Sequence, residues 1–297
     1  MKQQTAFKIL AAFMIFTMVF SVFAYMFRGP LDETEKNQES SPQQEKYNPE
    51  LWNLHPDMPF YSISDALNMT PVGAEKASYL DLEGMPPQMM QWAKGFRVDI
   101  VNAPLIDFTD YIYKSNTTKV YYAGLKNESF LILSTMYPEK NDFEYIVYPN
   151  TGILVRQEQG LEGMYNIMGT PVIFAPPQTA IDVFNIITSL NKTPTAYDRY
   201  EGLLGKVDPA PFQVVNSNVS FAKQFYMGVK QTNGSYERTA AYLDVNSSTL
   251  KKLNQLKANS TENGLAEFNI TRSGNYTLVK VVSPDLSKVL PGPEETS

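Results

Sequence analysis

The chain contains 297 residues, of which 43% are hydrophobic and 12% aromatic, and its formal net charge is −6 at pH 7. This composition is typical of a folded globular protein with one large domain or two ordinary ones. The chain has no cysteine, which excludes disulfides, thiolate metal sites and cysteine nucleophiles. The acidic balance argues against nucleic acid as a partner.

A long apolar run lies near the N-terminus. Residues Ile9 to Phe27 are 19 uncharged, mostly apolar residues that follow Lys2 and Lys8. A helix of this length roughly matches the hydrocarbon core of a bilayer, and the lysines favour a cytoplasmic N-terminus. We therefore expect residues 1–28 to be a signal-anchor helix of a single-pass cell-membrane protein whose C-terminal part lies outside the cytoplasm. A cleaved signal peptide ending at Ala24 is the alternative.

Segments poor in aliphatic residues flank the central part of the chain. Residues 29–50 are polar and charged, a composition that predicts a disordered stalk. Residues 285–297 are predicted to form a disordered tail. Folded structure is therefore expected between residues 51 and 284.

Asn-x-Ser/Thr sequons are frequent. The chain has 21 asparagines and 41 serines and threonines in 297 residues, so about three sequons are expected by chance, whereas ten are present. Asn68 and Asn191 are the weakest, because a proline follows each of them directly after the threonine. The excess favours a glycosylated surface protein, and the lack of cysteine favours an archaeal one; turn chemistry rich in Asn, Ser and Thr is the alternative. The predicted glycosylation sites are Asn116, Asn127, Asn218, Asn233, Asn246, Asn259, Asn269 and Asn275.

An eight-residue stretch occurs twice. KVYYAGLK at Lys119 to Lys126 aligns without gaps with KQFYMGVK at Lys223 to Lys230, and a sequon follows each copy. Asn-Gly-Ser or Asn-Glu-Ser between two β-rich runs predicts a hairpin. Fainter similarities before and after the octets keep the same order, which predicts an internal duplication of a module of about a hundred residues. A chance similarity of two amphipathic hairpins is the alternative.

The second half of the chain has the clearer pattern of elements. In chain order we expect a strand at 170–176, helices at 177–190 and 195–207, strands at 211–216, 223–230 and 235–244, a helix at 247–259, and strands at 266–271 and 276–282. Such an order predicts an α+β fold. After the transmembrane helix we therefore expect two tandem, pseudo-equivalent modules, residues 51–160 and 161–284. Each would be an antiparallel sheet with helices on one face, in the ferredoxin-like β-α-β-β-α-β order.

Motifs that carry catalytic chemistry are not evident. His55 is the only histidine, and the chain has neither a G-x-S-x-G elbow nor a phosphate-binding glycine loop. The pairs Asp107/Asp110 and Asp142/Glu144 lack the surrounding loop of a calcium site and are interpreted as solvated turn residues. We therefore predict no catalytic residue, no metal and no cofactor, although a hydrolase could draw two carboxylates from anywhere in the chain.

Two stretches are candidate binding surfaces. Tyr111 and Tyr113 lie in a tyrosine-rich run that could line a groove for sugars or peptides. Met89, Met90 and Trp92 could form an adaptable apolar contact surface. Core packing is the alternative for both stretches.

These observations favour a membrane-anchored, extracytoplasmic surface protein that binds or scaffolds without catalysis. Its expected partners are the membrane, through the N-terminal helix, and envelope proteins or glycans, but not nucleic acid. A carboxylate-based hydrolase of envelope polymers and a subunit of a larger membrane complex are the alternatives.

Overall fold

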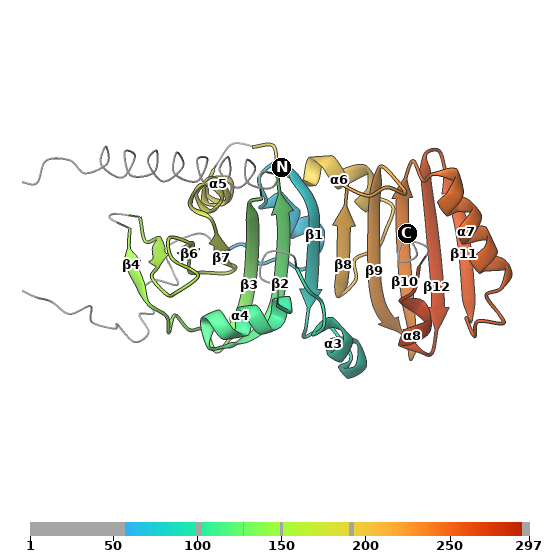
Figure 1. The fold of residues 1–297 in the computed structure, drawn as a ribbon, viewed down its shortest axis with the longest axis horizontal. Coiled ribbons are helices and arrows are strands. Elements are labelled where there is room, and N and C mark those ends of the chain that lie inside the picture. The colour runs from blue at the N-terminus through green and yellow to red at the C-terminus, as the bar shows by residue number, and fades with distance from the viewer. Residues whose placement is uncertain (1–56, 99–102, 127, 149–150, 190–192, 293–297) are drawn as a thin grey trace, which may run out of the picture. The chain divides into compact units, whose positions relative to one another are not determined.

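The computed structural model of the protein describes residues 57–98, 103–126, 128–148, 151–189 and 193–292 (Figure 1). These residues fall within one structural unit, residues 45–297. The predicted anchor and stalk, together with His55, Asn127 and Asn191, lie outside the described residues. Within the described ranges no helix is both long and apolar enough to cross a membrane.

The described ranges contain twelve strands and seven helices. The strands are β1 (Ala74–Asp81), β2 (Asn116–Leu125), β3 (Phe130–Tyr137), β4 (Tyr145–Val147), β5 (Leu154–Arg156), β6 (Tyr165–Ile167), β7 (Val172–Ala175), β8 (Phe212–Asn216), β9 (Gln224–Thr232), β10 (Ser235–Leu243), β11 (Glu267–Ser273) and β12 (Tyr276–Ser283). The helices are α2 (Ile63–Asn68), α3 (Pro87–Ala93), α4 (Leu105–Tyr113), α5 (Pro177–Thr188), α6 (Tyr197–Leu204), α7 (Ser247–Ala258) and α8 (Leu286–Val289).

All twelve strands belong to one antiparallel sheet, with the order β11-β12-β10-β9-β8-β1-β2-β3-β7-β6-β5-β4. Near the centre of the sheet β1 pairs with β8, which joins segments more than a hundred residues apart in sequence: Lys76 lies opposite Asn216, and Leu80 lies opposite Phe212. From this pair the meander β1-β2-β3 extends to one side and β8-β9-β10 extends to the other (Figure 1). Continuous backbone pairing therefore links the two halves of the chain.

Each face of the sheet has its own hydrophobic core. We call the first the α4 face; its buried residues include Val120 and Tyr122 of β2 and Phe212 of β8, packed with residues of α3, α4, α7 and α8. We call the second the α6 face; its buried residues include Tyr121 of β2 and Tyr226 of β9, packed with residues of α2, α5 and α6. Because both faces are covered, the central strands are buried on both sides.

The predicted fold class is therefore wrong. The sheet is a single one of twelve strands with helices on both faces, not two ferredoxin-like modules with helices on one face. The elements expected in the second half do form, but β7 pairs with β3 of the first half, and β8 pairs with β1. Apolar periodicity indicates that a strand exists and which residues share a face, but it does not indicate the partner strand.

The repeated octets form strands, as predicted, but their aligned side chains do not lie on the same face of the sheet. The first lies in β2 and the second in β9, and each strand continues into a hairpin, with β3 or β10. Tyr122 belongs to the core of the α4 face, whereas its aligned partner Tyr226 belongs to the core of the α6 face. Side chains alternate between faces along a strand, so a displacement of one residue reverses every side chain.

The octets instead share a local packing device, a tyrosine that covers a glycine two residues later. A Cβ added at Gly228 would lie 2.3 Å from the Tyr226 hydroxyl, and one added at Gly124 would lie 3.3 Å from the Tyr122 hydroxyl. Residues i and i+2 of a strand share a face, so the absent side chain makes room for the ring. The Tyr-x-Gly pattern is thus explained by packing within each strand.

Candidate binding pocket between β1, β2 and β8

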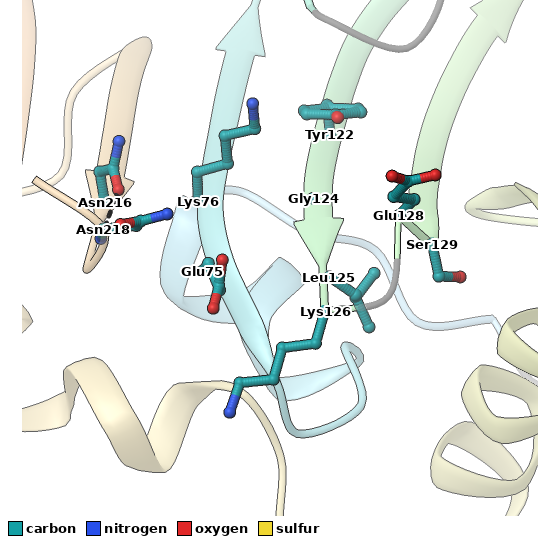
Figure 2. Close-up of a pocket in the computed structure, with 10 residues that line it drawn as sticks. All are labelled: Glu75, Lys76, Tyr122, Gly124, Leu125, Lys126, Glu128, Ser129, Asn216 and Asn218. Atoms are coloured by element: carbon teal, nitrogen blue, oxygen red, sulfur yellow. Dashed lines mark hydrogen bonds between the residues drawn. The ribbon is translucent and has the colours of Figure 1, made fainter. Parts of the chain in front are cut away.

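A cavity of about 850 Å³ lies where the two halves of the sheet meet. Its described lining comes from β1, β2 and β8 and from the segments that follow β2 and β8. Figure 2 shows the lining residues: Glu75, Lys76, Tyr122, Gly124, Leu125, Lys126, Glu128, Ser129, Asn216 and Asn218. The size is that of a site for a small molecule or a short polymer segment.

A β-bulge in β1 brings two oppositely charged neighbours into the cavity. Ala74 lies opposite Leu125 and Lys76 lies opposite Gly124, so Glu75 is an extra residue in β1. Consecutive side chains normally point to opposite faces of a sheet, but a bulge redirects them. Glu75 and Lys76 consequently both line the same cavity.

The bulge is held in place from the other half of the chain. The Glu75 carbonyl accepts hydrogen bonds from the Tyr200 hydroxyl at 2.7 Å, the Ser217 backbone N–H at 2.7 Å and the Ser217 hydroxyl at 3.0 Å. Tyr200 is on α6 and is fully buried. Three donors on one carbonyl fix the backbone of the bulge, from which the Glu75 and Lys76 side chains extend to the cavity.

Gly124 gives the Lys76 side chain its place on the cavity floor. A Cβ at Gly124 would lie 3.0 Å from Lys76 Cε and 3.2 Å from Lys76 Cγ. The aliphatic stem of the lysine therefore packs against β2 where Gly124 has no side chain, and Figure 2 shows it running along β1 on the side of Tyr122. Tyr122 is 4% exposed, and burial raises the pKa of its hydroxyl, which stays protonated as a neutral donor.

The charges of the cavity balance. Lys76 and Lys126 carry two positive charges, and Glu75 and Glu128 carry two negative ones. Figure 2 shows Glu75 and Glu128 on opposite sides of the end of β2, with the carboxamides of Asn216 and Asn218 beside β1. Such a lining complements a polar ligand that carries both signs of charge better than a polyanion or a polycation.

Metal binding is not indicated by the described part of the chain. No group of three or more His, Cys, Asp or Glu side chains within it is arranged to hold a metal ion. Asp110, one of the paired carboxylates noted in the sequence, accepts a hydrogen bond from the Thr117 backbone N–H at 2.7 Å. It stabilises the connection between α4 and β2.

The described asparagines of the predicted glycosylation sites are all exposed; they are Asn116, Asn218, Asn233, Asn246, Asn259, Asn269 and Asn275. Several of them also have a local structural role. Asn246 caps α7 by accepting a hydrogen bond from the Thr249 backbone N–H at 2.8 Å, and Asn233 occupies a left-handed turn position with φ of 52°. Asn218 lies at the cavity, so a glycan there would stand at its entrance. Glycosylation stays a prediction.

The residues of the two predicted binding surfaces are separated in the structure. On α4, Tyr111 is 70% exposed, whereas Tyr113 is fully buried and its hydroxyl accepts a hydrogen bond from Asn166 Nδ2 at 2.6 Å. On α3, Met89 is fully buried, Met90 is half-buried, and the Trp92 ring packs against Phe212 with ring centroids 4.6 Å apart. None of these residues lines the cavity.

No sequence pattern marks the cavity residues as a site. Lys126, Gly124 and Tyr122 belong to the repeated octet, whose pattern indicates a strand and not a binding site. Glu75 and Asn216 belong to strands whose proximity depends on the pairing of β1 with β8. No local signal in the sequence indicates that pairing.

Comparisons with known proteins assign neither a family nor a function. No family model matches the chain, and no curated protein matches it. Among solved structures, crystal form III of TP0453 is 11% identical, with a TM-score of 0.43, and covers 75% of this chain and 95% of that chain. Form IV is 12% identical, with a TM-score of 0.43 over 77% and 94% of the two chains, and form I is 12% identical, with a TM-score of 0.37 over 72% and 90%. Similarity at this level carries no functional argument.

Proposed function

We propose that the chain is a membrane-anchored, extracytoplasmic binding protein that holds a polar envelope ligand in the cavity between β1, β2 and β8. The apolar run at residues 9–27 and the excess of sequons support the location. The observation that carries the binding proposal is the cavity of about 850 Å³ with two lysines, two glutamates and two carboxamides.

The lining favours binding over catalysis. The two carboxylates lie on opposite sides of β2 (Figure 2), whereas a glycosidase needs two carboxyls that face each other across the scissile bond. The two lysines and two glutamates of the lining supply charge complementarity to a ligand with both signs of charge. The ligand class that fits is a zwitterionic or neutral polar molecule, such as a short peptide with both termini free or a sugar that carries both an amino and a carboxyl group.

Native mass spectrometry on the protein extracted gently from its own membranes tests the proposal. We expect a mass that begins at Met1, carries glycans and retains a small polar molecule in a one-to-one ratio. A cleaved chain without glycans and without a retained molecule would contradict all three predictions: the N-terminal anchor, the glycosylation and the binding of a ligand. Turnover of an envelope polymer that is lost in Glu75→Gln would instead support the hydrolase alternative.

One lysine from each octet can be changed to test whether the retained molecule binds in the cavity. Lys126→Gln removes a cavity charge, and Lys230→Gln changes the aligned lysine of the second octet, which pairs with Glu237 at 3.4 Å outside the cavity. We expect Lys126→Gln to weaken binding about tenfold, because a hydrogen bond to a charged group contributes roughly 1.5–3 kcal/mol. Lys230→Gln should leave the affinity unchanged. Equal affinities for both variants would place the ligand elsewhere.

A further inference from the structure

The connection between β3 and β4, together with β4, forms a second surface with features of a ligand site. We call residues 137–148 the β3–β4 segment. Residues 136–142 line a cavity of about 630 Å³, which shares no lining residue with the pocket between β1, β2 and β8. The following inference is therefore independent of the proposed function.

Asn141 is the first observation that points to a ligand. It lines this cavity, it is 1% exposed, and neither its Nδ2 nor its Oδ1 has a hydrogen-bond partner in the described part of the chain. Leaving a buried polar group without a partner is unfavourable, because its lost hydration is not replaced, and native proteins rarely do so. The carboxamide is therefore left with an unused donor and an unused acceptor at the cavity.

The backbone around Asn141 is held at several points. The Ser115 hydroxyl donates a hydrogen bond to the Pro138 carbonyl, and Lys140 Nζ donates one to the Lys114 carbonyl at 3.2 Å. The Phe143 N–H donates to the Asn141 carbonyl at 3.0 Å. The segment is thus organised before any ligand arrives, which lowers the entropic cost of binding.

Exposed apolar side chains are the second observation. Within the β3–β4 segment, Tyr137 is 76% exposed, Ile146 57%, Val147 50% and Tyr148 48%. Exposed apolar and tyrosine side chains are enriched in interaction surfaces. The opposite edge strand, β11, instead exposes polar residues such as Asn269, Thr271 and Arg272.

The register of β4 adds a backbone contribution. Glu144 and Tyr148 form hydrogen bonds with the two residues that flank β5, since the Gln157 N–H donates to the Glu144 carbonyl at 3.0 Å and the Tyr148 N–H donates to the Ile153 carbonyl at 2.8 Å. Backbone groups alternate in direction along a strand. The N–H and C=O of Val147 consequently point away from β5, at the end of the sheet.

The net charge of the β3–β4 segment indicates whether a second copy of this chain or a different protein binds there. The β3–β4 segment contains Glu139, Asp142 and Glu144 against the single lysine Lys140, which gives a net charge of −2. Two copies that met through this segment would bring like charges together, whereas a cationic partner is complementary.

We propose that the β3–β4 segment binds an extended, cationic peptide segment of a partner protein. Asn141 pairs with the N–H and C=O of one extended residue, which point to the same side of a peptide in β conformation. The trans amide of an N-acetyl sugar directs its N–H and C=O in opposite directions, so the carboxamide could pair with only one of them. Tyr137, Ile146 and Val147 contact the side chains of the peptide.

The test measures peptide binding by the full-length protein in lipid nanodiscs. The probe is fluorescein-labelled Lys-Val-Thr-Val-Thr-Val-Lys amide, and fluorescence anisotropy gives its affinity. The same peptide N-methylated at two consecutive central residues is the control for backbone recognition, because it lacks donors on both edges. We expect saturable binding to the first peptide and affinity at least about tenfold lower for the second.

Two asparagine variants separate recognition from packing. Asn141→Leu should lower the affinity for the probe about tenfold. It should not lower the melting temperature, because it removes a buried carboxamide that has no hydrogen-bond partner. Asn254→Leu, at an exposed asparagine of α7, should leave the affinity unchanged. If Asn141→Leu does not fold, the hydrogen-exchange rate of the Val147 amide is measured in the unaltered protein with and without the probe. We expect the probe to slow this exchange about tenfold.

Three results would overturn the proposal. The first is no saturable binding of the probe up to about 1 mM, and the second is equal affinity for Asn141→Leu and the unaltered protein. The third is self-association of the protein that Asn141→Leu abolishes, because a second copy would then occupy the segment.

Discussion

Arg156 shows how this chain accommodates a buried charge. Its side chain on β5 is fully buried, and its guanidinium lies 3.5 Å from the ring centroid of Phe143. It donates to Asn166 Oδ1 at 2.6 Å, to the Ile112 carbonyl at 3.1 Å and to Glu158 Oε2 at 2.5 Å. A planar, weakly hydrated guanidinium can satisfy these acceptors and pack on an aromatic ring at the same time.

Removing that guanidinium should destabilise the fold. Arg156→Met keeps most of the volume but leaves Asn166 Oδ1 and the Ile112 carbonyl buried without this donor, so we expect a loss of about 3 kcal/mol in the free energy of unfolding. Urea denaturation measures it. Arg199→Met, at an exposed arginine, is the control and should change stability by less than about 0.5 kcal/mol. A similarly small change for Arg156→Met would contradict the argument.

The helix α6 connects the core of the α6 face to the pocket. Tyr200 is its contact residue, since its hydroxyl reaches the Glu75 carbonyl of the bulge at 2.7 Å and also lies 3.1 Å from the Ser217 hydroxyl. The bulge in turn aims Glu75 and Lys76 into the cavity. A change on the far side of the sheet should therefore be measurable in the pocket.

Tyr200→Phe tests that connection. The variant removes one of three donors to the Glu75 carbonyl, so we expect a loss of about 1 kcal/mol in stability and weaker binding of the retained molecule. Tyr61→Phe, at a tyrosine that is 67% exposed, should change neither. Thermal unfolding and the affinity of the retained molecule are the two measurements. Lower stability with unchanged affinity would show that the bulge does not depend on α6.

Buried tyrosines give the protein as a whole a dependence on alkaline pH. Burial raises the pKa of seven tyrosine hydroxyls in the described part of the chain: Tyr79, Tyr113, Tyr121, Tyr122, Tyr200, Tyr226 and Tyr242. The folded state therefore binds these protons more tightly than the unfolded state does. The resulting stability is complete below the ordinary tyrosine pKa, near 10, and is lost as the pH rises toward the folded-state values.

We expect the free energy of unfolding to fall steeply above about pH 10. Each buried tyrosine contributes a slope of up to about 1.4 kcal/mol per pH unit while it is ionised only in the unfolded state. Urea denaturation between neutral pH and about pH 11 measures the slope, and tyrosinate absorbance shows whether ionisation coincides with unfolding. Gradual ionisation of all tyrosines in a protein that stays folded would contradict the prediction.

Local structure could be predicted where neighbouring residues determine it. Asn233 and Gly234 form the turn between β9 and β10 with φ of 52° and 78°, as Asn-Gly between two β-rich runs indicates. The helix α7 begins after its cap Asn246 and buries Leu253. In these cases backbone preferences, capping and side-chain periodicity act over a few residues, so the sequence carries the information directly.

The arrangement of these elements depends on contacts between distant residues. The repeated octets predicted two similar modules, yet their aligned tyrosines, Tyr122 and Tyr226, lie on opposite faces of one sheet. The candidate pocket needs the pairing of β1 with β8 and the bulge at Glu75, which Ser217 secures from 142 residues away. Periodicity reports the face that a side chain occupies within its own strand. The partner strand is selected by the packing of both cores at once, and for that reason only the folded protein shows the site.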